Sequence, residues 1–252
     1  MKRLDLAADN YDDFNLGDEV EVEVCDQKIP CKLHGGQVLN VSITSPLRYL
    51  GVGRDKVVVS GLVGGLDSVV ESTGLVRVAV GIARQGGNAV KQLRGLSGYS
   101  RLRKLVPNAP TYPWYAQSVD QQVVLMPDLT QEGKIVTAQN DRILSPEKLD
   151  RLEAAFDDIV AQLQAFVDGL PFGVTVTFDA YFAILGEHSS RLFLGDFDDF
   201  AIGHDNLDRS VHNRLQAEKW LEAVANYFGD RRMVSYAFQT WAHQHELPPR
   251  GK

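Results

Sequence analysis

The stretch LGVGRDKVVVSG, residues 50–61, places a Gly-x-Gly turn directly before a valine-rich strand. Gly51 and Gly53 carry no Cβ, so backbone amides in this turn can approach phosphate oxygens closely. Arg54 and Lys56 add positive charge beside them. The stretch matches neither a Walker loop, because no Gly-Lys-Ser/Thr follows, nor a complete dinucleotide fingerprint. It therefore predicts either a phosphate-binding turn or an ordinary tight turn between two strands.

Strand patterns continue on both sides of this turn. In EVEVEVC, residues 19–25, valines alternate with glutamates, which is typical of a half-exposed strand. The runs KIPCKL, residues 28–33, and QVLNVSIT, residues 37–44, extend a small meander of strands. We expect Ser45-Pro46 to end this meander. Glycines separate the later runs as turns. The expected strands are residues 19–25, 28–33, 37–44, 56–61, 68–72, 75–83, 114–119 and 121–129.

Helical patterns dominate the second half of the chain. Apolar residues recur at three and four residues within 147–170, after an N-cap and first-turn proline at Ser145-Pro146. Strands clustered before helices predict an α+β protein with two lobes rather than alternating βαβ units. We expect a strand-rich N-terminal lobe, residues 1–129, whose residues 1–45 form an extra meander before the body of the lobe at 46–129. A mainly helical C-terminal lobe, residues 130–252, follows. The expected helices are residues 88–105, 147–170, 212–228 and 232–244, with a hairpin of YFAIL and RLFLGDF between the second and third.

Composition limits the function classes. The net charge of −7 gives no reason to expect binding to nucleic acid, which requires a basic face. Acids interrupt the first residues, and no apolar run approaches the length of a membrane span, so we expect a soluble, cytoplasmic protein without a membrane partner. Two cysteines, Cys25 and Cys31, are too few for a disulfide framework or a zinc site.

Two aspartates flank the expected hairpin of the second half. Asp179 precedes YFAIL, and Asp196 follows RLFLG. If these strands pair, both carboxylates fall near one end of the hairpin, where they could hold magnesium or act as a general base. The alternative is that each caps a turn or the start of the next segment.

Taken in order, these features resemble the protein-kinase-like fold of bacterial kinase-like proteins. Residues 50–61 resemble the glycine-rich loop, 75–83 the third strand and 121–129 the strand leading into the hinge; the resemblance spans roughly residues 47–200. It implies ATP and Mg²⁺ as ligands, with Asp179 at the position of the catalytic aspartate. The motif DFD, which contains Asp196 and Asp198, resembles the magnesium-binding DFG motif. The nucleotide would then contact Gly51, Gly53, Arg54, Lys56 and Arg77.

Three positions depart from the family pattern. Arg77 or Gly81 stands where the family has a phosphate-binding lysine, residues 88–106 contain no acid to pair with it, and Ile184 replaces a metal-binding asparagine. Positioning and charge neutralisation supply most of phosphoryl-transfer catalysis. The resemblance therefore implies a pseudokinase that binds a protein partner and perhaps a nucleotide. One alternative is an atypical ATP-dependent phosphotransferase using Arg77, Asp179 and Asp196, and another is a non-nucleotide interaction protein whose strand-rich half is the binding module.

Overall fold

A computed structural model describes the chain at residues 1–8, 11–53, 55–70, 74–86, 89–90, 93, 95–131, 134–137, 150–185, 190–195 and 209–228. The chain forms two compact units. The first, here called the barrel unit, comprises residues 1–100 and 112–128. The second, the sheet–helix unit, comprises residues 101–111 and 129–252.

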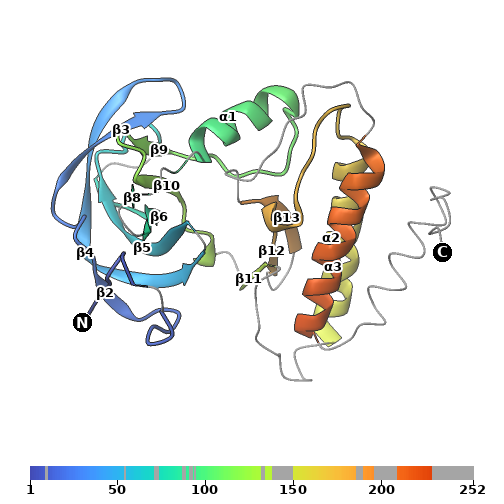
Figure 1. The fold of residues 1–252 in the computed structure, drawn as a ribbon, viewed down its shortest axis with the longest axis horizontal. Helices are drawn as coiled ribbons and strands as arrows, with labels where there is room; N and C mark the ends of the chain where they lie inside the picture. Colours follow the sequence, from blue (N-terminus) through green and yellow to red (C-terminus); the bar gives the residue numbers. More distant parts are fainter. Residues whose placement is uncertain are drawn as a thin grey trace. The chain divides into compact units, whose positions relative to one another are not determined.

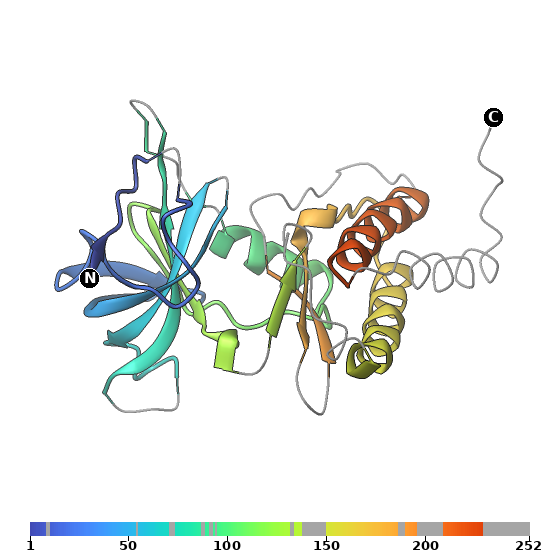
Figure 2. The ribbon, with the colours of Figure 1, turned by 90° about the horizontal axis from the view of Figure 1, so that it is seen from below.

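The barrel unit is built on a closed barrel of six antiparallel strands (Figures 1 and 2). Strands β3, β4, β5 and β6 form a meander, and the hairpin of β9 and β10 inserts between the two ends of that meander. Pairing of β10 with β6 and of β9 with β3 closes the ring. The six strands are β3 (Lys28–Leu33), β4 (Val38–Val52), β5 (Lys56–Gly64), β6 (Val76–Ala83), β9 (Ala116–Ser118) and β10 (Val123–Pro127).

The interior of this barrel is filled by its own side chains. Because successive strand residues point to opposite faces, every second residue of each strand enters the core. A six-stranded barrel is narrow enough for such side chains to occupy its interior. The inward-facing residues of β5 and β6 are fully or almost fully buried, as in Val57, Val59, Val63, Val78, Val80 and Ile82.

Several short elements lie outside the six strands of the barrel. Strand β1 (Lys2–Arg3) pairs in parallel with β2 (Glu19–Glu21), and β2 pairs with the second half of β4. Strands β7 (Gln85–Gly86) and β8 (Ala89–Val90) form a separate ribbon. Helix α1 (Gly95–Leu105) begins later than the helix expected at 88–105, because residues 89–90 are extended.

Strand β4 continues through Ser45-Pro46, where the sequence pattern predicted a break. The Ser45-Pro46 peptide bond is cis, and the register of β4 against β5 shifts between Thr44 and Arg48. An irregular register of this kind tolerates a residue that lacks a backbone N–H, which a regular ladder does not. The expected end of the meander is therefore wrong, and β4 is one long bent strand.

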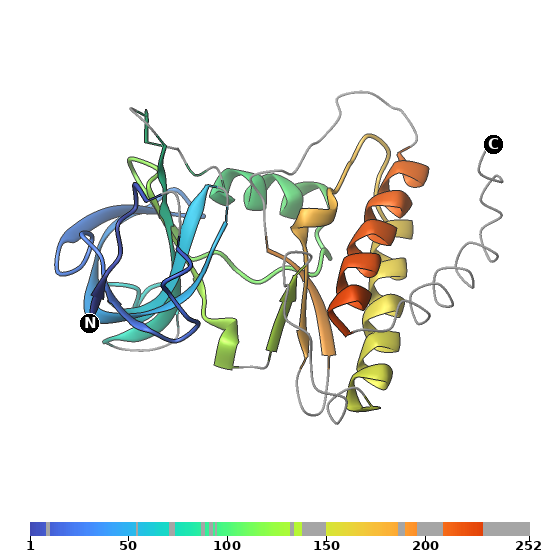
Figure 3. The same ribbon diagram turned by 60° about the horizontal axis from the view of Figure 1, so that its bottom comes forward.

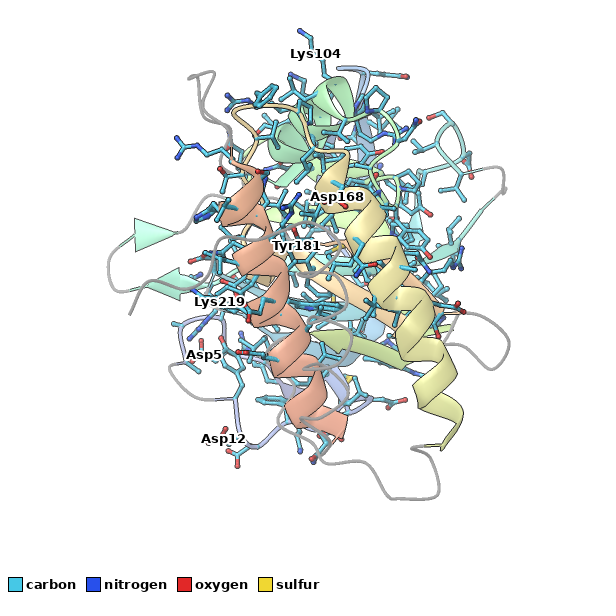
Figure 4. All side chains as sticks on the ribbon, turned by 90° about the vertical axis from the view of Figure 1, so that its right-hand side faces the viewer. Asp5, Asp12, Lys104, Asp168, Tyr181 and Lys219 are labelled. Atoms are coloured by element: carbon cyan, nitrogen blue, oxygen red, sulfur yellow. The ribbon has the colours of Figure 1, made fainter. Side chains whose placement is uncertain are left out.

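The sheet–helix unit packs two helices against one face of a three-stranded antiparallel sheet (Figure 3). The ion pair of Asp168 and Arg214, at 3.4 Å, joins the last residue of α2 to the N-terminal part of α3, so the two helices run antiparallel. The ring of Tyr181 lies between the helices, 6.3 Å from the Phe166 ring and 6.0 Å from the Trp220 ring (Figure 4). The elements are η1 (Leu129–Gln131), β11 (Lys134–Thr137), α2 (Asp150–Asp168), η3 (Phe178–Ala180), β12 (Tyr181–Leu185), β13 (Ser190–Leu194) and α3 (Ser210–Phe228).

The kinase-like fold predicted from the order of motifs is wrong, and with it the two-lobed architecture with a helical C-terminal lobe. The strand-rich half closes into a barrel, and the described residues of the whole chain contain three α-helices. Local periodicity identified most strands, but the pairing of β9 with β3 joins residues far apart in the sequence, which no local pattern reveals. The pseudokinase interpretation therefore loses its structural basis. The helix expected at 232–244 lies outside the described residues.

Candidate functional site

The glycine turn between β4 and β5 is closed by its own backbone. The amide of Gly53 donates a hydrogen bond to the carbonyl of Lys56 at 2.8 Å, so this amide is already used within the hairpin. The carbonyl of Gly53 accepts a hydrogen bond from the Arg84 guanidinium at 3.3 Å. Gly51 is the partner of Val58 in the β4–β5 ladder. Arg54, predicted to contact the same ligand, lies outside the described residues.

Lys56 lies beside this turn at one end of the β5–β6 hairpin, whereas Arg77 lies towards the opposite end of that hairpin. In the β5–β6 register Lys56 is opposite Ala83, and Arg77 is opposite Leu62. Six residue steps separate the two positions along β5, which corresponds to about 20 Å. A Cβ built on Gly81 would lie 3.5 Å from Cδ of Lys56 and 2.7 Å from Cγ2 of Val124, so bare backbone at Gly81 leaves room for both side chains. The structure thus groups Gly51, Gly53 and Lys56, and separates them from Arg77.

Arg77 belongs to a polar cluster at its own end of the barrel. The Ser60 hydroxyl donates a hydrogen bond to the Asp128 carboxylate, and the Arg77 guanidinium donates one to the Ser60 oxygen at 3.5 Å. Ser60 is buried, whereas Arg77 is exposed. This cluster ties the end of β10 to β5 and β6, which gives Arg77 a role in holding strand ends together.

Asp179 is half-buried in η3, immediately before β12 in the sheet–helix unit. The predicted hairpin that follows it forms as β12 and β13, with Tyr181 opposite Leu194. Asp196 and Asp198, the predicted metal ligands, lie outside the described residues. Among the residues that the structure describes, no three His, Cys, Asp or Glu side chains lie close enough together to hold a metal ion.

The two cysteines are free thiols in different surroundings. Burial and, to a smaller extent, the nearby charge of Asp120 together raise the pKa of the Cys31 thiol to about 12. Burial also raises the pKa of half-buried Cys25. Both groups are therefore protonated at neutral pH, which makes them poor nucleophiles and poor metal ligands.

A surface on the outside of the barrel combines exposed valines with exposed lysines, and we call it the β3 surface. Lys28, Pro30 and Lys32 are exposed at alternate positions of β3 and share one face. Val38 of β4 lies opposite Lys32 and is 55% exposed. Val119, 59% exposed, donates its amide to the Pro30 carbonyl at 2.9 Å, which continues the β3–β9 register by one residue and places it opposite Pro30. The β3 surface consists of Lys28, Pro30, Lys32, Val38 and Val119.

The two lysines of the β3 surface make neither an ion pair nor a hydrogen bond within the part of the chain that the structure describes. The neighbouring carboxylate of Asp120 accepts hydrogen bonds from the Ser118 hydroxyl and, at 3.1 Å, from the Gln122 amide. The β3 surface therefore presents two exposed lysines that pair with no carboxylate among the described residues, on a chain whose net charge is −7.

Sequence reasoning did not single out the β3 surface. The strand pattern KIPCKL places Lys28, Pro30 and Lys32 at alternate positions, and so on one face of a strand. The exposure of Val38 and Val119 was not visible, because it depends on which strands pair across the barrel. Only the combination of both observations distinguishes this face from an ordinary solvated strand.

Comparisons with known proteins give no family for the chain. No protein-family model matches the sequence, and no curated protein matches it significantly. None of the described helices is long and apolar enough to cross a membrane.

Proposed function

We propose that the chain is an interaction protein that binds a partner protein through the β3 surface of its barrel unit. The observation that carries the proposal is the pair of exposed valines, Val38 and Val119, on either side of β3. Single exposed apolar side chains are common on protein surfaces, whereas apolar side chains grouped in one exposed patch with a polar rim are a feature of contact surfaces. The filled interior of the barrel also directs any ligand of this unit to its outer face.

A comparative binding experiment tests this function. The wild-type chain and the double variant V38S/V119S are immobilised and exposed to lysate, and retained proteins are quantified by mass spectrometry. The matched control is V211S, which alters another valine, 48% exposed on α3, in the sheet–helix unit. We expect a protein retained by the wild type and by V211S to be lost with V38S/V119S.

The retained protein is then purified and titrated against the same three proteins by calorimetry. Truncating two contact valines at the centre of an interface should raise the dissociation constant of the complex by about tenfold or more. Equal affinity for the wild type and V38S/V119S would remove the β3 surface as the binding site.

Binding of ATP with Mg²⁺ near the glycine turn is a second proposal. It is favoured by the position of Lys56, a cation that lies beside the turn and whose stem crosses the bare backbone of Gly81. A thermal-shift titration with ATP and Mg²⁺ tests it, because a ligand bound by the folded state raises the melting temperature. We expect a shift that K56A abolishes, and no shift in the wild type contradicts the proposal.

Phosphoryl transfer, for which the sequence predicted Asp179 and Asp196, is a separate question that radiolabelled ATP tests independently of the glycine turn. Transfer that D179N and D196N both abolish would establish an enzyme and displace the pure interaction role. Absence of transfer together with a thermal shift leaves a nucleotide-binding interaction protein.

A further inference from the structure

The β3 surface offers two positive charges at a defined spacing. Lys28 and Lys32 lie four residues apart on one extended strand, so their Cα atoms are separated by about 13 Å. Pro30 lies between them on the same face, with Val119 opposite it. The order along the strand is therefore cation, apolar contact, cation.

Strand addition is blocked over Pro30–Leu33, the part of β3 where both edges are in use. One edge of β3 is paired with β4 from Lys28 to Lys32, the other is paired with β9 from Cys31 to Leu33, and the Pro30 carbonyl accepts a hydrogen bond from the Val119 amide. A partner that adds a strand needs an unpaired edge. A ligand must instead lie across the outer face and be recognised through side chains.

The structure assigns to this surface an acidic, extended segment of a partner protein, in which two carboxylates four residues apart flank an apolar residue. This inference rests on the proposed function and specifies its partner. An extended ligand lying along β3 repeats the spacing of the strand itself, so its first and fifth side chains reach Lys28 and Lys32. Its third side chain then contacts Pro30 and Val119, while Val38 contacts the ligand beside Lys32.

Electrostatics favours this occupant over a second copy of the chain. Each copy carries a net charge of −7, so two copies repel each other at long range. A short acidic segment carries little charge beyond the carboxylates that meet the lysines. Its affinity should fall with salt, because exposed charge pairs are screened.

The direct test uses two fluorescein-labelled nonapeptides of identical composition in fluorescence anisotropy with the full chain. One has glutamates at its third and seventh positions and leucine at its fifth, with serine, threonine and glycine elsewhere. In the other, the two glutamates are adjacent. We expect the spaced peptide to bind several-fold to about tenfold more tightly, and to weaken between about 0.05 M and about 0.5 M salt.

Variants locate the binding. K28A/K32A should reduce affinity for the spaced peptide by about tenfold, whereas K219A, which removes an exposed lysine of α3 (Figure 4), should leave it unchanged. Equal binding of both peptides, or an unchanged affinity in K28A/K32A, overturns the inference. Tighter binding of a labelled single-stranded oligonucleotide or of phosphatidylserine vesicles, lost in K28A/K32A, also overturns it, because the surface would then recognise phosphate.

The inference and the proposed function fail separately. If the partner protein is lost with V38S/V119S but bound equally by K28A/K32A, the surface binds a partner that is not acidic. If V38S/V119S retains the partner, the surface is not the binding site, and the peptide result then reports only the charge of the two lysines.

Discussion

The buried hydroxyl of Ser60 donates a hydrogen bond to the carboxylate of Asp128, a residue 68 positions further along the chain. Ser60 is only 2% exposed, and Arg77 donates to the same hydroxyl oxygen. The contact joins the middle of β5 to the last residue of the barrel unit. The alternation of β5 would place Ser60 on the outer face of the barrel, yet its hydroxyl links two segments that lie far apart in the sequence.

Replacing Ser60 with alanine should lower the free energy of unfolding of the barrel unit by about 1–3 kcal/mol. The change leaves the half-buried carboxylate of Asp128 without one of its hydrogen-bond donors. A buried polar group left without a partner costs more free energy than a typical hydrogen bond contributes. Urea denaturation measures the effect, with S68A at an exposed position as the control. A loss in S60A no greater than in S68A would show that the contact does not stabilise the fold.

Arg84 holds the N-terminal segment against the barrel. Its guanidinium donates to the Ala8 carbonyl at 3.1 Å and to the Gly53 carbonyl at 3.3 Å, and lies 5.2 Å from the Tyr11 ring centre. In R84A, amides within residues 1–8 should exchange hydrogen about tenfold faster, since local opening becomes easier.

R84K separates charge from geometry at the same position. Lysine keeps the cation but lacks the planar fork that serves two carbonyls at once, so exchange should be intermediate. R101A, at an exposed arginine of α1, should leave exchange in residues 1–8 unchanged. Protection in R84A equal to that of the wild type would contradict the role of Arg84.

The two thiols should react at very different rates in the folded protein. With a pKa of about 12, Cys31 is a thiolate in about one molecule in ten thousand at pH 8, and it is also buried. Iodoacetamide followed by mass spectrometry should label Cys25 first, and both cysteines equally in urea. Early labelling of Cys31 without urea would contradict the buried placement.

The raised pKa of Cys31 also makes stability depend on pH. The folded state favours the protonated thiol, so its contribution is complete below the unfolded pKa of about 8.5 and is lost as pH rises towards the folded value of about 12. The free energy of unfolding should therefore decline above about pH 9, and less steeply in C31A. The same slope in both proteins would assign the decline to other groups.

Tyr181 carries a buried hydroxyl with no hydrogen-bond partner among the residues that the structure describes. Burial raises the pKa of this phenol well above its usual range. Y181F removes only the oxygen, and should change the free energy of unfolding by less than about 1 kcal/mol, in the stabilising direction. Y181L also removes the contacts with the Phe166 and Trp220 rings, and should cost about 2–4 kcal/mol. A loss above about 1 kcal/mol in Y181F would reveal a hydrogen bond to the hydroxyl.

Part of the candidate site was accessible from local pattern. The turn at Gly51 and Gly53 and the cation Lys56 beside it follow directly from the stretch that joins β4 to β5. Arg77 was grouped with them by analogy with a family, but the register places it at the far end of the hairpin. The sequence separation of Lys56 and Arg77 could not reveal this distance. In a hairpin each residue lies opposite one partner only, and the register of the two strands decides which partner that is.

By itself, the sequence determined the strands at residues 28–33, 56–61 and 75–83, the hairpin at 181–194 and the core of α2. Each of these depends on a short apolar run, on side-chain alternation or on helical spacing between residues close together in the chain. Tertiary structure alone decided that the barrel closes through β9 and β3, and that β4 runs on through Ser45-Pro46. It also decided that Val38 and Val119 stay exposed beside Lys32 and Pro30. Closure depends on strand register and on filling one shared core, which are properties of residues brought together from distant parts of the chain.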